Sequence, residues 1–161
     1  MKLCNSEIIK KIKVLEEKKC RILGEEETNR TTTYQKEFDI IDLGYDFNET
    51  RKAVEEINRE VIKLKHALNV VNATVNVPEF DMTIGECIVY MAQLNAEKRV
   101  IEPMSMIPAK KSSTTYGGAV EYTIANYDID ECKQKLSDVN ETICKLQVSI
   151  DRMNLSHTIE V

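Results

Sequence analysis

The sequence predicts a mainly α-helical protein, an antiparallel four-helix or coiled-coil bundle with a small β-ribbon at one end. Apolar side chains recur at alternating spacings of three and four residues in two long segments, the pattern of a helix with one apolar stripe. The 161 residues include only five Gly, three Pro and 6% aromatic residues, a composition that favours helices over sheets. With 42% hydrophobic residues, the chain fits one bundle domain over residues 1–161.

The two heptad segments predict the longest helices, at about residues 49–74 and 128–154. Asn48 is the expected N-cap of the first, and Asp128 with Glu131 opens the second. An apolar stripe this narrow is typical of a coiled-coil seam, so we expect the two helices to pair with each other. The predicted seam residues are Val54, Ile57, Val61, Leu64, Leu68, Val71, Ile129, Leu136, Val139, Ile143, Leu146 and Ile150.

Two shorter helices are expected at about residues 6–23 and 83–102. Ser6 is a suitable cap for the first, and Gly24 is placed to stop it. Thr83 and Glu86 form a capping box for the other, and Pro103 is expected to end it.

The connections over residues 25–47 and 103–127 are longer than the usual links between bundle helices. Strand-like patterns fall within them, at about residues 31–38 and 119–126. If successive helices alternate in direction, both connections emerge at one end of the bundle. We therefore expect these two loops to pair with each other as the β-ribbon.

The second long loop also holds the candidate contact site. Its lysines, hydroxyl groups and the pair Gly117–Gly118 would suit an anion or a protein partner, while the alternative is a solvated arm. The candidate residues are Lys110, Lys111, Ser112, Tyr116 and Tyr122.

No catalytic, cofactor-binding or metal-binding residues are assigned, and no cofactor is expected. A di-iron bundle needs two inward-facing Glu-x-x-His pairs, but the residues three positions before the two histidines, His66 and His157, are Lys63 and Asn154. Zinc-ligand spacing and phosphate-binding glycine motifs are absent from the sequence. The sequence leaves enzymatic activity open and favours a protein that is not an enzyme.

The net charge and the cysteines indicate which partners and which cellular compartment to expect. The net charge of −5 argues against nucleic acid as a partner, and the basic first helix is expected to be offset by the acidic segment that follows it. The five cysteines are widely spaced, which favours a reducing compartment. With neither a signal peptide nor an apolar membrane span, the expected location is the cytoplasm.

Several short segments resemble the septicolysin-like family, small bacterial helical proteins of unestablished function. The likeness begins with Met1-Lys2-Leu3 and the Glu-rich segment after the first helix. It continues through Leu68-Asn69-Val70-Val71-Asn72-Ala73-Thr74, Thr83-Ile84, and a strand leading into the last helix. The resemblance implies a helical fold and a membrane-active, cytolysin-like role.

The function that we expect first is a non-enzymatic interaction or structural protein that forms homo-oligomers through its heptad-patterned helices. Strict heptads motivate it, because a lone globular bundle usually shows wider apolar faces. One alternative is the membrane-active role, which rests on the resemblance alone. Another is a ligand-binding bundle that uses the loop-bearing end.

Overall fold

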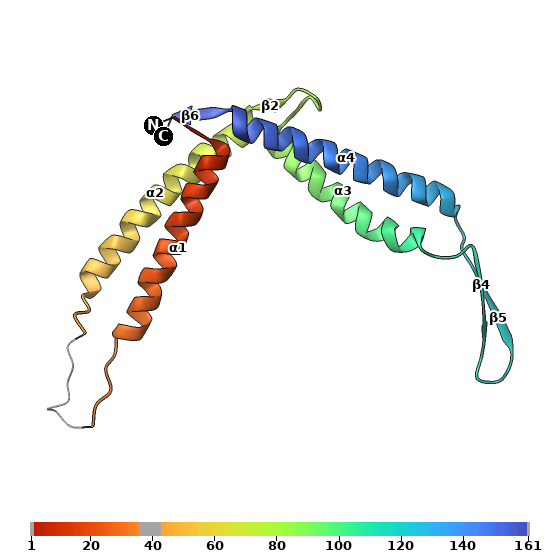
Figure 1. Cartoon of the computed structure of the whole chain (residues 1–161), viewed down its shortest axis with the longest axis horizontal. Coiled ribbons are helices and arrows are strands. Elements are labelled where there is room, and N and C mark those ends of the chain that lie inside the picture. The colour runs from red at the N-terminus through yellow and green to blue at the C-terminus, as the bar shows by residue number, and fades with distance from the viewer. Residues whose placement is uncertain (1, 36–42, 161) are drawn as a thin grey trace. The chain divides into compact units, whose positions relative to one another are not determined.

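The computed structural model describes residues 2–35 and 43–160 (Figure 1). Four helices hold most of these residues, and the strands pair antiparallel in small two-stranded sheets. The sequence predicts a single bundle domain over residues 1–161. Within the structure the chain divides into two compact units, residues 1–72 with 154–161 (unit 1) and residues 73–153 (unit 2).

Unit 1 is built on the hairpin of α1 (Asn5–Asn29) and α2 (Phe47–Thr74), which run antiparallel (Figure 1). The strands β1 (Lys2–Cys4) and β6 (Thr158–Glu160) pair antiparallel and join the two ends of the described chain. The hairpin core is apolar. Its buried members are Ile8, Val54, Ile57, Val61, Leu64 and Val71.

Ion pairs follow the line of contact between α1 and α2. Lys11 Nζ lies 2.7 Å from Glu60 Oε1, and Lys65 Nζ lies 3.1 Å from Glu16 Oε1. The pair Lys11–Glu60 joins a basic residue of α1 to an acidic residue of α2, as expected for a basic first helix followed by an acidic segment. The pair Glu16–Lys65 has the charges reversed, with the acid on α1 and the base on α2.

The first helix differs from its predicted bounds at both ends. It begins at Asn5 with Cys4 as N-cap residue, because the Glu7 carboxylate accepts a hydrogen bond of 2.8 Å from the Cys4 backbone N–H. It continues through Gly24 to Asn29. A glycine inside a helix costs only about 1 kcal/mol, and Glu26 beyond it is held by Tyr45 and Arg51. The predictions of a Ser6 cap and a Gly24 stop were wrong.

Unit 2 is built on the hairpin of α3 (Ile84–Ser105) and α4 (Ile129–Ser156), also antiparallel (Figure 1). Lys135 Nζ lies 3.4 Å from Glu97 Oε1, and the Tyr127 hydroxyl donates a hydrogen bond of 2.8 Å to the Met104 carbonyl. The short strands β2 (Asn76–Val77) and β3 (Met82–Thr83) precede α3.

The starts of α3 and α4 are set by the caps that the sequence predicts. Thr83 N–H donates to Glu86 Oε2 at 2.7 Å, and Glu86 N–H donates to Thr83 Oγ1 at 3.2 Å. The Asp128 carboxylate accepts from Asp130 N–H and Glu131 N–H. The end of α3 lies two residues beyond Pro103, because a proline in the last turn removes a single helix hydrogen bond.

The predicted seam residues are all buried or half-buried. Their packing partners, however, differ from the prediction that the two heptad helices pair with each other. The seam of α2 is buried within unit 1, which also holds α1, and the seam of α4 within unit 2, which also holds α3. Each heptad helix therefore packs against a shorter helix of its own unit.

The predicted β-ribbon also forms from different segments. β4 (Lys110–Thr114) pairs antiparallel with β5 (Val120–Ile124), so the second long loop folds back on itself. The strand expected at residues 119–126 is present as β5. Residues 31–35 of the first loop contain no strand, and 36–38 lie outside the described residues.

Candidate functional site

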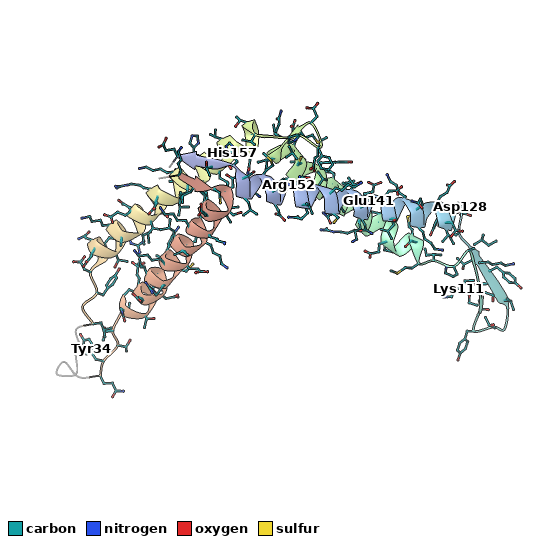
Figure 2. The ribbon with its side chains drawn as sticks, turned by 45° about the horizontal axis from the view of Figure 1, so that its top comes forward. Tyr34, Lys111, Asp128, Glu141, Arg152 and His157 are labelled. Carbon is teal, nitrogen blue, oxygen red and sulfur yellow. The ribbon has the colours of Figure 1, made fainter. Side chains whose placement is uncertain are left out.

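The five candidate contact residues all lie on the β4–β5 hairpin, which extends beyond the ends of α3 and α4 (Figures 1 and 2). Lys110 and Tyr122 come together, with Lys110 Nζ 4.6 Å from the centroid of the Tyr122 ring. Ser112 lies directly opposite Tyr122. Lys111 is on the other face of the hairpin, and Tyr116 lies in the turn that joins the strands.

One face of this hairpin carries the apolar side chains of β5 beside Lys110, Ser112 and Thr114 of β4, and it is open to solvent. Residues directly opposite each other in an antiparallel pair share a face, and successive residues alternate between faces. Val120, Tyr122 and Ile124 therefore lie on one face, where 56%, 62% and 61% of each residue is exposed. The opposite face carries Lys111, Glu121 and Thr123.

The backbone hydrogen bonds show which edge groups of the hairpin are paired. Thr115 N–H donates to the Ala119 carbonyl at 2.8 Å, and Ala125 N–H donates to the Ala109 carbonyl at 3.1 Å. Because inward and outward groups alternate along a strand, the backbone groups of Val120, Tyr122 and Ile124 point away from β4. Within the described residues these outward groups have no backbone partner.

A second exposed apolar surface lies on α3. One side of this helix is buried through Ile84, Cys87 and Leu94. On the other side Ile88, Val89 and Val100 are 41%, 60% and 63% exposed. Ala92 and Ala96 are also exposed. We call these five residues the outer face of α3.

At 3.6 residues per turn the outer face covers about a third of the helix circumference. Arg99 is the charged residue of α3 on that side. This face is not among the predicted sites, because an apolar stripe in a sequence is expected to lie in the core. The sequence does contain a signal for this face, since the α3 segment has apolar residues around most of the helix circumference.

A polar cluster in unit 2 holds the β2–β3 turn against α4. The hydroxyl of buried Ser149 donates a hydrogen bond to the Glu79 carboxylate, and Arg152 Nη1 lies 2.7 Å from Glu79 Oε1 (Arg152 is labelled in Figure 2). The Ser149 hydrogen bond, followed by Arg152, lowers the pKa of the Glu79 carboxyl. Glu79 is thereby kept as a structural anion, and Ser149 donates to this carboxylate rather than to a histidine that would activate it as a nucleophile.

In unit 1 the end of the α1–α2 hairpin has a small pocket of about 250 Å³. Its rim includes Glu25, Glu26, Asp46 and Glu49. The Tyr45 hydroxyl donates to Glu26 at 2.7 Å, which lowers the pKa of Glu26 and raises the pKa of Tyr45. Arg51 pairs with the same carboxylate, so the Glu26 side chain is engaged by its own unit.

The remaining chemistry-bearing residues do not gather into a site. Across residues 2–35 and 43–160, no three Asp, Glu, His or Cys side chains are placed to hold a metal ion. All five cysteines are free thiols, and burial raises the pKa of Cys87. No helix in the described part of the chain has both the length and the apolar character that a membrane crossing requires.

Comparison with known proteins identifies a similar fold and indicates no activity. No family model and no curated protein matches the sequence. The structure is similar to the crystal structure of a functionally unknown conserved protein from Corynebacterium diphtheriae, with a TM-score of 0.73 at 13% identity. The match covers 99% of this chain and 100% of that one, and at this identity it shows the fold alone.

Proposed function

We propose that this chain is a non-enzymatic structural or interaction protein that associates with further copies of itself through its helices. The outer face of α3 carries the proposal, because Val89 and Val100 are more than half exposed on an ordered helix. A helix that is apolar on most sides is normally buried in its native assembly. Large exposed apolar surfaces mark interaction sites.

A second copy of the same chain fits this face. Ala92 and Ala96 lie one turn apart near the middle of α3, with Ile88 and Val100 at the two ends of the face. An antiparallel contact centred between the alanines sets Ala92 against Ala96 of the second copy and Ile88 against Val100. Small residues at the centre allow close approach, and the large ones fill the ends.

The charges on α3 are compatible with the same contact. Arg99 lies toward one end of the outer face, so the two copies of Arg99 are at opposite ends of an antiparallel contact. This places no like charges face to face. Two α3–α4 hairpins joined in this way form a four-helix bundle between copies.

The substitution Val89→Glu tests the proposal by placing a charge within the apolar contact. We expect the wild-type chain to form dimers or larger species in sedimentation velocity, and Val89→Glu to raise the dissociation constant by about tenfold or more. The matched control is Ile62→Glu on α2, where the isoleucine is 66% exposed and lies outside the outer face of α3.

A wild-type chain that stays monomeric at several hundred micromolar would contradict the proposal. So would a Val89→Glu variant that associates as strongly as wild type. Leakage of vesicles containing anionic lipid would instead support the membrane-active role that the septicolysin-like resemblance implies. Circular dichroism melts of both variants establish that the helices are intact.

A further inference from the structure

We infer that the outer edge of β5 is a second self-association surface, on which β5 pairs antiparallel with β5 of another copy. The observation behind this is an isolated β-hairpin whose strands are exposed at every residue. A two-stranded hairpin on its own is marginally stable in water, whereas more strands give a stable sheet. The hairpin is nonetheless formed over five residue pairs.

The two edges of the hairpin differ in how open they are to pairing. β4 carries Lys110 and Lys111, and lysines are a common device that keeps an exposed edge from accepting another strand. β5 has the sequence Val-Glu-Tyr-Thr-Ile, rich in residues that favour strands, without a lysine or proline. The edge left unprotected is therefore that of β5.

The register of the hairpin makes the β5 edge complementary to itself. The outward backbone groups belong to Val120, Tyr122 and Ile124, with Tyr122 in the middle. A two-fold axis at Tyr122 pairs the two Tyr122 backbones with each other, and pairs Val120 with Ile124 of the other copy. Every outward N–H and C=O group of these residues then gains a partner.

The side chains of β5 are compatible with this antiparallel pairing of two β5 strands. Val120 against Ile124, and the two tyrosines, are the β-branched and aromatic cross-strand pairs that stabilise sheets. On the other face Glu121 meets Thr123 of the second copy, so no like charges lie opposite each other. Pairing through β4 would instead add Lys110 and Lys111 of both copies to one narrow interface.

This surface goes beyond the contact proposed for α3 and is independent of it. In an antiparallel α3 contact, the hairpins that follow the two helices lie at opposite ends of that contact. Pairing through β5 then recruits a third copy. If the α3 contact of the proposed function and the β5 contact both form, copies join in a row through alternating α3 and β5 contacts. This row rests on the proposed function, whereas the β5 contact does not.

Amide hydrogen exchange of the full chain carrying Val89→Glu tests the β5 contact without the α3 contact. We expect exchange at Val120, Tyr122 and Ile124 to slow as the protein concentration rises. Exchange at Ser112 and Thr114, outward on the β4 edge, is expected to stay unchanged and serves as the internal control. Sedimentation velocity of the same variant is expected to show a dimer.

Two proline substitutions, each combined with Val89→Glu, test which edge of the hairpin pairs with the second copy. Val120→Pro removes an outward N–H from β5, and Thr114→Pro removes one from β4 directly opposite. We expect Val120→Pro to raise the dissociation constant of the dimer by about tenfold or more, and Thr114→Pro to leave it unchanged. Equal effects of the two prolines would overturn the assignment to β5.

The outcomes separate this inference from the proposed function. If Val89→Glu is monomeric while wild type is dimeric, the α3 contact stands and the β5 contact fails. If Val89→Glu associates as wild type does and Val120→Pro abolishes that association, the β5 contact stands and the α3 contact fails. Flotation of monomeric Val89→Glu with phosphatidylglycerol vesicles would assign the hairpin to a lipid surface instead and overturn the inference.

Discussion

Three carboxylates at turns and helix starts, those of Glu7, Glu79 and Glu86, have defined hydrogen-bonding roles in this protein. Glu7 and Glu86 accept from the backbone N–H groups of Cys4 and Thr83, and these hydrogen bonds lower the pKa of both carboxyls. Glu79 has its pKa lowered first by Ser149 and then by Arg152. A carboxyl whose pKa is lower in the folded state contributes stability above its unfolded pKa, and loses that contribution as the pH falls through the folded pKa.

Substitution of Glu79 by Gln tests this residue-scale linkage. The variant is expected to be less stable than wild type near neutral pH, where the Glu79 anion accepts from Ser149 and Arg152. The difference is expected to shrink on acidification, since wild type then loses the same interaction. Urea midpoints between about pH 7 and pH 3 measure it, with Glu121→Gln on the exposed hairpin as control. A pH-independent difference would rule out the linkage.

At the scale of elements, α1 shows how neighbouring contacts override a local stop signal. Gly24 favours termination, yet the helix runs on to Asn29, where Glu26 is held by Tyr45 and Arg51. Helix propensity is a weak preference of roughly 1 kcal/mol at a glycine, which tertiary contacts readily exceed.

The substitution Gly24→Ala is expected to raise the free energy of unfolding by roughly 0.5–1 kcal/mol, because Ala loses less backbone entropy than Gly in a helix. The added Cβ would meet no heavy atom within 4 Å, so no clash offsets the gain. Thermal or urea unfolding measures it. Gly118→Ala provides the contrast, since Gly118 has a φ of +79° and the same change there is expected to destabilise. A loss of stability in Gly24→Ala would show that α1 is not helical at this position.

The whole molecule consists of two units, each with an apolar core of its own. Leu64 is 1% exposed in the core of unit 1, and Leu146 is 0% exposed in the core of unit 2. Because each leucine belongs to the core of its own unit, a cavity at either position should loosen that unit before the other.

Leu64→Ala and Leu146→Ala are each expected to cost roughly 2–5 kcal/mol of local stability. Hydrogen exchange should accelerate over α1 and the first part of α2 in the Leu64 variant, and over α3 and α4 in the Leu146 variant. Val148→Ala, at a residue 51% exposed on α4, is the matched control and should change little. Equal acceleration over both units by either leucine variant would mean that the chain unfolds as one cooperative block.

The candidate contact loop shows which part of a site the sequence can supply. The alternation of Val120, Tyr122 and Ile124 predicts β5, and the hairpin carries all five residues chosen as contact candidates. The predicted partner strand lies in the first long loop, because strand propensity does not identify which strand pairs with which. The short turn at Gly117–Gly118 made the local pairing available, since adjacent strands meet at a smaller entropic cost than distant ones.

The amino-acid sequence is sufficient to predict that the chain is mainly helical, where its heptad stripes lie and which side chains of those stripes turn inward. A periodic apolar pattern follows from the geometry of one helix, so residues such as Leu64 and Leu146 can be assigned without knowledge of their surroundings. The structure is needed to show that α2 lies with α1, that α4 lies with α3, and that the outer face of α3 is exposed among the described residues. The physical reason is that hydrophobic burial is non-directional, so an apolar stripe specifies that it is covered but not which helix covers it.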